Sequence, residues 1–283
     1  MAGRPLVWRG RTFELEARRT LVMGILNVTP DSFSESGEHF DEAAAIARGL
    51  EIAEQGADLL DVGGESTRPG APPVSAEEEW RRIGGVIPAV RRRSSIPISV
   101  DTRKPEIAWK AVEAGAAIVN DVGGLRDVAM ARVVSQSGAG VVIMHMQGEP
   151  ATMQADPRYD DVVAEVRAFL ARQVESATAA GVAREAIVVD PGIGFGKSPF
   201  HNVELLRELP QIGSLGRPVL VGVSRKSFLA PFHPKGDKRR LEASLAAAGF
   251  AVQRGANVVR VHDVQETVRY VRTLDHLMES PVD

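Results

Sequence analysis

Short runs of apolar residues recur along the chain, and a polar residue stands at or near the end of each. Four of them begin with glycine and a small residue, namely GADLLDVG from Gly56, GAAIVNDVG from Gly115, GAGVVIMHM from Gly138 and GANVVRVHD from Gly255. Glycine suits the left-handed conformation that ends many helices, and a short continuous run of Val, Ile and Leu is typical of a parallel strand covered on both faces. Each unit therefore predicts a helix end followed by a buried strand.

Four further segments have the same apolar character and complete a set of eight expected strands. They are residues 21–27, 96–101, 186–192 and 218–224. Helical periodicity fills the intervals between strands. Two of the expected helix faces carry Ile46, Leu50 and Ala53, and Val163, Val166, Leu170 and Val174.

Strand and helix alternate eight times, so we expect an α/β fold, specifically a closed (β/α)8 TIM barrel. A closed barrel fits better than an open sheet because no GxGxxG turn follows the first strand. The sequence VWRGRTFEL, which precedes that strand, predicts a short N-terminal β-hairpin at the bottom of the barrel. Barrels of this length commonly form one domain, and we expect residues 1–283 to be a single domain.

Composition and charge exclude several classes of function. Hydrophobic residues make up 44% of the chain and charged residues 25%, which predicts a globular protein with a large core. The net charge of −3, with both signs interspersed, provides no basic field, so we expect neither a nucleic acid nor a membrane as partner. The chain has no cysteine, which excludes disulfides and thiolate chemistry.

The first twenty residues lack the apolar segment of a secretory signal, and no apolar run reaches the length of a membrane span. We therefore expect a cytoplasmic protein.

Polar residues stand at all eight strand ends. In chain order they are Asn27, Asp61, Asp101, Asn120 with Asp121, His145, Asp190, Ser224 with Arg225 and Lys226, and Arg260 with His262. Asp and Asn also favour such positions because they cap helices and open turns, so one position alone decides little. Because active sites of barrels lie at the carboxyl ends of the strands, the full set predicts one converging site.

Three acceptor-rich residues of this set, Asp101, Asn120 and Asp190, have the apolar Met144 and Phe195 as neighbours. Carboxylate and amide oxygens in an apolar slot suit a flat heterocycle with several N–H donors, such as a guanidine-like edge. The alternative is that backbone amides satisfy the buried carboxylates.

Basic residues follow other strands. Arg68 with Thr67, and Arg260 with His262, would suit a phosphate group, and Asn27 would suit a Mg²⁺ that draws its other ligands from a diphosphate. A salt-bridged rim without ligand is the alternative for the last two basic residues. Lys226 has the chemistry of a Schiff-base nucleophile but no evident activating partner, so a hydrogen-bonding or stacking role is equally open.

Eight blocks of the sequence resemble the signature motifs of bacterial dihydropteroate synthases. They are MGILNVTPDSFS, DVGGESTRPG, SVDTRKPE, NDVGG, MHMQG, DPGIGFGK, VGVSRKSF and VRVHDV. The resemblance implies a (β/α)8 fold, a homodimer, and the Mg²⁺-dependent condensation of 6-hydroxymethyl-7,8-dihydropterin diphosphate with p-aminobenzoate. It also implies a dissociative displacement, in which the pterin carries positive charge as the diphosphate leaves and no strong base is required.

The resemblance also assigns roles to single residues. The pterin ring is expected to contact Asp101, Asn120, Met144, Asp190, Phe195 and Lys226. The diphosphate is expected to contact Asn27, Thr67, Arg68, Arg260 and His262, with Asn27 as metal ligand. The p-aminobenzoate pocket, where sulfonamides compete, is expected to contain Phe33, Thr67, Pro69, Lys226 and Ser227. The catalytic groups would be Asp101, Asp190, Lys226, Arg260 and His262.

Two residues of the polar set are expected to support others, Asp61 by ordering the GGEST loop and His145 by supporting the pterin wall. The chain departs from the family pattern at Glu35-Ser36, where Asp-Gly is common, and at Ala243, where Gly is common. Two other functions remain open, a pterin-binding paralogue without synthase activity and a methyltetrahydrofolate-dependent methyltransferase. The methyltransferase would not need Arg68, Arg260 and His262 arranged for a diphosphate, and the altered first loop is the only feature that suggests the paralogue.

Overall fold

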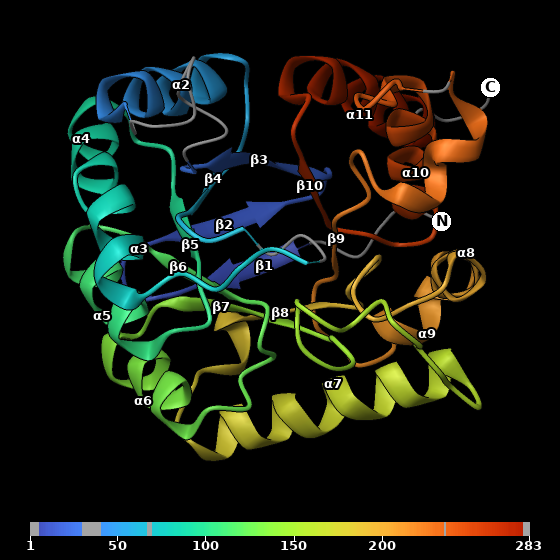
Figure 1. Ribbon diagram of the computed structural model, residues 1–283, viewed down its shortest axis with the longest axis horizontal. Helices are drawn as coiled ribbons and strands as arrows, with labels where there is room; N and C mark the ends of the chain where they lie inside the picture. Colours follow the sequence, from blue (N-terminus) through green and yellow to red (C-terminus); the bar gives the residue numbers. More distant parts are fainter. Residues whose placement is uncertain (1–5, 30–40, 67–69, 235, 280–283) are drawn as a thin grey trace.

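Eight parallel strands form the centre of the molecule (Figure 1). The computed structural model describes residues 6–29, 41–66, 70–234 and 236–279. The strands are β3 (Leu21–Asn27), β4 (Leu59–Gly63), β5 (Ile98–Asp101), β6 (Ile118–Asp121), β7 (Gly140–Met144), β8 (Ile187–Asp190), β9 (Leu220–Val221) and β10 (Val258–Val261). Their spatial order is β8-β7-β6-β5-β4-β3-β10-β9, and a bridge between Val189 and Val219 joins the two outer strands. The predicted barrel is confirmed.

Helices surround the sheet, as the alternating pattern predicted (Figure 1). They are α2 (Glu42–Glu54), α3 (Ala76–Ile83), α4 (Val86–Arg93), α5 (Pro105–Glu113), α6 (Val128–Ser137), α7 (Val162–Ala179), α8 (Pro199–Arg207), α9 (Leu209–Gly213), α10 (Leu241–Gln253) and α11 (Val264–Glu279). The expected faces of α2 and α7 both pack against the core. The helix α6 ends on Gly138, whose φ of +69° is the left-handed conformation expected there.

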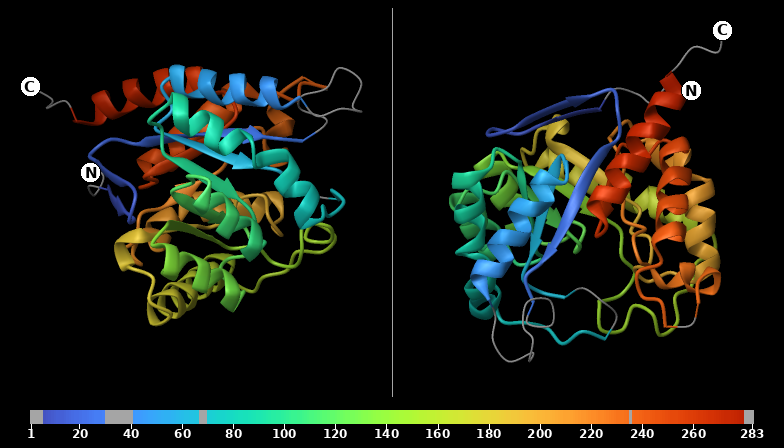
Figure 2. Two further views of the ribbon diagram at one scale, coloured as in Figure 1. Left: turned by 90° about the vertical axis from the view of Figure 1, so that its left-hand side faces the viewer. Right: turned by 90° about the horizontal axis from the view of Figure 1, so that it is seen from above.

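The predicted N-terminal hairpin consists of β1 (Leu6–Arg9) and β2 (Glu14–Ala17). It lies at the end of the barrel from which the strands point away (Figure 2). Leu6 and Trp8 are buried and pack with Leu21, Met23 and other inward-facing strand residues, and the Trp8 Nε1 donates to the Ala186 carbonyl at 2.9 Å. The hairpin therefore closes the amino end of the barrel with apolar side chains.

Successive side chains of a strand point to opposite faces of the sheet, and this alternation decides which residues at the strand ends face the barrel interior. On β10, the apolar Val258 lies in the interior cluster and Arg260, two positions on, enters the carboxyl half of the barrel. The side chain of Asp121 lies one position beyond Asn120 and accepts hydrogen bonds from the backbone amides of Gly123 and Leu125. It therefore orders the following turn and does not join the converging set.

The seventh strand is shorter than predicted. We expected residues 218–224, whereas β9 contains only Leu220 and Val221. After Gly222 the chain turns, and Arg225 has a positive φ of 60° while its backbone amide donates to the Ser244 Oγ at 3.0 Å. This early turn brings Lys226 back over the barrel mouth, where it lines the cavity described next.

Candidate active site

A cavity of about 570 Å³ opens at the carboxyl ends of the strands. Ten of the fourteen residues predicted for the site line it, namely Asn27, Asp101, Asn120, Met144, Asp190, Phe195, Lys226, Ser227, Arg260 and His262. The other four, Phe33, Thr67, Arg68 and Pro69, lie outside the described residues, as does the Glu35-Ser36 departure. Residues far apart in the sequence therefore meet in one cavity, although their individual roles stay predictions.

Strand register sets the acceptor-rich side of the cavity. Asp101 on β5 pairs with Asn120 on β6, and Asp190 on β8 pairs with Met144 on β7. All four side chains are buried. One oxygen of Asp190 accepts a hydrogen bond from the Gly192 amide at 2.7 Å, so backbone amides satisfy that carboxylate in part. The result is a slot of carboxylate and amide oxygens beside a methionine.

Burial determines the protonation of these carboxylates. It raises the pKa of Asp101 to about 7, although the positive charge of Arg260 opposes the rise. Burial likewise raises the pKa of Asp190 to about 6, against the effects of the Gly192 amide and of Lys226. Both groups therefore change charge close to neutral pH.

Lys226 lies above the ring of Phe195, with its ammonium 4.1 Å from the ring centroid. Burial, and then the nearby Arg260, lower the pKa of Lys226 to about 8. This geometry favours the stacking and hydrogen-bonding alternative for Lys226, because the ammonium keeps its proton at neutral pH and rests against an aromatic face.

The guanidinium of Arg260 lies between two carboxylates. Its Nε donates to Asp61 at 2.6 Å and its Nη2 donates to Asp101 at 2.7 Å. Asp61 is 0% exposed and also accepts from the Asn120 amide at 3.0 Å. We expected Asp61 to order the GGEST loop, but these hydrogen bonds instead position Arg260 and Asn120, because the side chain of Asp61 points into the barrel.

The imidazole of His262 is the second predicted anion ligand. Its Nδ1 lies 3.1 Å from the Ser224 Oγ, which also accepts from the His262 backbone amide at 3.2 Å. Burial and then the charge of Arg225 lower the pKa of His262 to about 3. A phosphate bound beside these two side chains would therefore meet the guanidinium of Arg260 and the neutral imidazole of His262.

Comparison with known proteins agrees with this geometry. The family described as pterin binding enzymes matches residues 23–262. The chain is also 45% identical, over 254 residues, to the dihydropteroate synthase of Escherichia coli (strain K12), and the match covers 90% of each protein. The chain belongs to the dihydropteroate synthase family. The family resemblance of the sequence motifs is thereby confirmed.

Solved dihydropteroate synthases from Xanthomonas albilineans have the same fold. The structure with 4-aminobenzoic acid superposes with a TM-score of 0.92 at 45% identity, covering 98% of this chain and 100% of that one. The structure with 7,8-dihydropteroate superposes with a TM-score of 0.84 at 44% identity, covering 93% and 95%. Within the described residues, no helix of this dihydropteroate synthase family member has the length and apolarity of a membrane span.

Sequence reasoning missed two basic residues of this dihydropteroate synthase site, Lys238 and Arg240, which also line the cavity. The Nη1 of Arg240 donates to the carbonyls of Arg225 and Lys226 at 2.7 and 3.2 Å, and so supports the turn after β9. The signal was present in the loop sequence PFHPKGDKRR, which follows a strand end and carries four basic residues.

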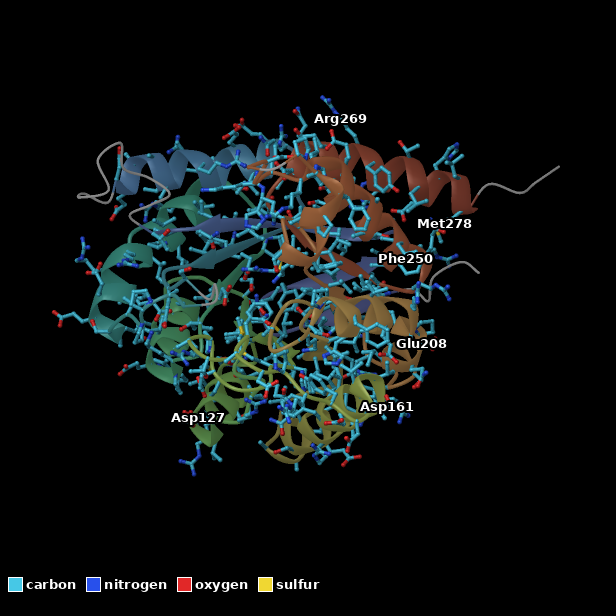
Figure 3. The ribbon with its side chains drawn as sticks, turned by 45° about the vertical axis from the view of Figure 1, so that its right-hand side comes forward. Asp127, Asp161, Glu208, Phe250, Arg269 and Met278 are labelled. Atoms are coloured by element: carbon cyan, nitrogen blue, oxygen red, sulfur yellow. The ribbon has the colours of Figure 1, made fainter. Side chains whose placement is uncertain are left out.

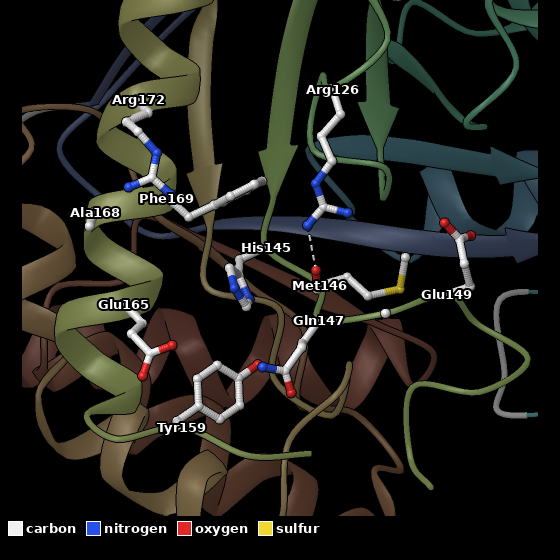
Figure 4. A pocket seen from close by; sticks show the side chains of 11 residues that line it. Arg126, His145, Met146, Gln147, Glu149, Tyr159, Glu165, Ala168, Phe169 and Arg172 are labelled. Carbon is white, nitrogen blue, oxygen red and sulfur yellow. Dashed lines mark hydrogen bonds between the residues drawn. The ribbon is translucent and has the colours of Figure 1, made fainter. Parts of the chain in front are cut away.

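His145 does not line the cavity at the barrel mouth. It lies on the wall of a second cavity of about 570 Å³ outside the barrel (Figure 4). Its ring packs edge-on against Phe169 at 5.0 Å between centroids and also lies near Tyr159. On its other side, its Nδ1 is 2.9 Å from the buried Nζ of Lys197. The expected support of the pterin wall by His145 stays a prediction.

Proposed function

We propose that this protein condenses 6-hydroxymethyl-7,8-dihydropterin diphosphate with p-aminobenzoate to give 7,8-dihydropteroate and diphosphate. It would thus be a transferase that forms a C–N bond. The observation that carries the proposal is the single cavity in which a buried acceptor slot adjoins a cationic side. The family and the solved relatives with 4-aminobenzoic acid and 7,8-dihydropteroate support it.

The pterin ring would occupy the slot formed by Asp101, Asn120 and Asp190. Its amino and ring N–H groups would donate to the two carboxylates, and the Asn120 amide would complete the edge. The side chains of Met144 and Phe195 would exclude water from the ring faces. Negative charge on the carboxylates would then stabilise the positive charge that develops on the pterin.

The diphosphate would lie on the side of Arg260 and His262. As the bond between the methylene carbon and the diphosphate oxygen breaks, the electron pair leaves with the oxygen, and Arg260 would stabilise that charge. The neutral His262 would contribute an N–H donor. The amine nitrogen then forms the new bond with its lone pair and releases a proton to water, so positioning replaces a general base.

A magnesium ion is compatible with the residues present. Asn27 offers one amide oxygen at the cavity wall, and among the described residues no group of three or more acidic or histidine side chains is arranged to hold a metal ion. This donor set fits Mg²⁺, which often keeps few protein ligands and takes the rest from phosphate and water. Bound there, the ion would offset the charge of the leaving diphosphate.

The deciding experiment measures diphosphate release from pterin diphosphate with and without p-aminobenzoate. We expect release that depends on the arylamine and forms dihydropteroate stoichiometrically. Saturable pterin binding without turnover would favour the paralogue without synthase activity. Methyl transfer from methyltetrahydrofolate would favour the methyltransferase, although Arg260 beside the slot fits a diphosphate better.

The proposal extends to assembly and location. We infer a homodimer from the family resemblance. The exposed apolar side chains Phe200 on α8 and Phe250 on α10 offer a surface for it, because these two helices contact each other. Figure 3 labels Phe250. Light scattering that reports a monomer would refute the inferred homodimer. A single domain over residues 1–283 is supported by the one closed sheet, and a cytoplasmic location stays a prediction.

A further inference from the structure

Lys197 is a buried ammonium group that the proposed reaction does not use. It is 2% exposed and ends the turn that follows β8. Its Nζ donates to the Phe195 carbonyl at 2.9 Å, contacts the His145 Nδ1 at 2.9 Å and donates to the His145 carbonyl at 3.4 Å. None of these partners is a carboxylate. An ammonium has three N–H donors, so the three contacts engage all of them.

These contacts join two loops that already lie backbone to backbone. Gly192 has a φ of +68°, and a Cβ there would lie 1.9 Å from the His145 carbonyl oxygen. Gly196 has a φ of +60°, and a Cβ there would lie 2.4 Å from the Gln147 carbonyl oxygen. The turn after β8 therefore packs closely on the loop after β7, and Lys197 is a polar tie between them.

The residues that Lys197 holds together are next to the proposed pterin slot. Phe195, whose carbonyl accepts from Lys197, places its ring under the ammonium of Lys226. His145 directly follows Met144, which lines the slot. A shift of either loop would therefore move one wall of the slot relative to the other.

The charge of Lys197 also acts on Asp190. Both Lys226 and Lys197 lower the pKa of Asp190, against the larger effect of burial. Burial lowers the pKa of Lys197 itself to about 7, while Asp190 opposes that change. Burial and Lys197 together lower the pKa of His145 to about 2, so His145 is neutral and its Nδ1 accepts. The other charged groups that influence this region are Asp101, Arg126, Lys226 and Arg260.

We propose that Lys197 is a positioning residue for pterin binding, which fixes the turn after β8 on the loop after β7 and adds positive charge behind Asp190. The proposal rests on the proposed pterin site. Lys197 does not touch the substrate, and it acts through Phe195 and Asp190.

The test uses Lys197→Met, which keeps the length of the side chain and removes its donors and charge. The measurements are fluorescence titration with 6-hydroxymethylpterin from pH 5 to 9, and KM for both substrates. We expect pterin binding weaker by about tenfold at pH 6.5, where Lys197 with its pKa of about 7 carries its proton, which is the size expected for lost hydrogen bonds to a charged group. The pH below which binding fails is expected to rise, because Asp190 without the charge of Lys197 protonates more readily.

Two further results separate positioning from general damage. The KM for pterin diphosphate is expected to rise while the KM for p-aminobenzoate stays within about twofold. The matched control, Lys110→Met, removes an exposed lysine of α5 and should leave every value unchanged. Equal rises in both KM values, or an unchanged pH limit and pterin affinity, would overturn the proposal.

If Lys197→Met does not fold, His145→Ala decides the question. This variant removes one acceptor and keeps the ammonium charge, so we expect weaker pterin binding with an unchanged pH limit. Unchanged affinity would overturn the proposal. A wild-type protein that binds no pterin at all would instead refute the proposed function, which keeps the two failures distinct.

Discussion

The ion pairs of Arg260 lead to a quantitative prediction about stability. Its guanidinium donates to Asp61 and Asp101 at 2.6 and 2.7 Å, and both carboxylates are almost fully buried. Arg260→Met leaves both carboxylates buried without their cation. Removing one partner of a buried pair costs about 3–5 kcal/mol, so we expect a loss of that size in the free energy of unfolding at pH 8.5.

The loss should depend on pH. The pKa of Asp101 is raised to about 7 in the wild type and would rise further without Arg260. A carboxyl with a raised pKa contributes stability that is lost as the pH rises through its folded-state pKa. In the wild type, the free energy of unfolding stops falling on this account near pH 7. In the variant, it continues to fall above pH 7 by up to about 1.4 kcal/mol per pH unit, because Asp101 still holds its proton in the folded state. The deficit, which is the free energy of unfolding of the wild type minus that of Arg260→Met, is therefore expected to increase above pH 7.

Urea unfolding at pH 6 and pH 8.5 measures this deficit. Arg272→Met is the control, because Arg272 pairs with Asp58 at 2.8 Å at the other end of the barrel and is partly exposed. We expect about 1 kcal/mol or less for the control, as for exposed ion pairs. A deficit for Arg260→Met that is below about 1 kcal/mol, or equal at the two pH values, would refute the reasoning. In binding assays, the same variant should lose affinity for pterin diphosphate more than for a bare pterin.

Three other predictions follow from the site and the hairpin. Asp190→Ala should abolish detectable pterin binding in calorimetry, because it removes the carboxylate at the centre of the slot, and wild-type affinity would contradict that role. Borohydride treatment with substrate should give no adduct at Lys226 by mass spectrometry, because its ammonium stacks on Phe195, and a stable adduct would favour an imine. Trp8→Ala should lower the free energy of unfolding by about 3–5 kcal/mol in urea with kcat unchanged, and a small loss would show that the hairpin is not part of the core.

Three residues that the sequence placed in the cavity lie two positions along a strand from a buried apolar residue, namely Asn27 after Ile25, Asn120 after Ile118 and Asp190 after Val188, whereas Asp101 follows the buried Ser99 at the same interval. The alternation of side chains along a strand was enough to predict that Asn27, Asp101, Asn120 and Asp190 face one cavity, and the diameter of the barrel was not needed for that prediction. It also explains the error over Asp121, since a one-residue offset points a side chain outward.

Pairings across the barrel did not follow from the sequence. Asp61 and Arg260 are separated by 199 positions, and only the closed sheet brings them together. The tie between Lys197 and His145 has the same origin, because it depends on how two loops pack outside the strands. The shortened β9 was also missed, since an apolar run gives no sign of where the chain turns away from the sheet.

The apolar closure of the amino end by Trp8 and Leu6 has a kinetic consequence. A barrel sealed at one end gives its ligands a single route of entry and exit. In the proposed reaction, both substrates would therefore reach the cavity, and the product would leave it, at the carboxyl ends of the strands.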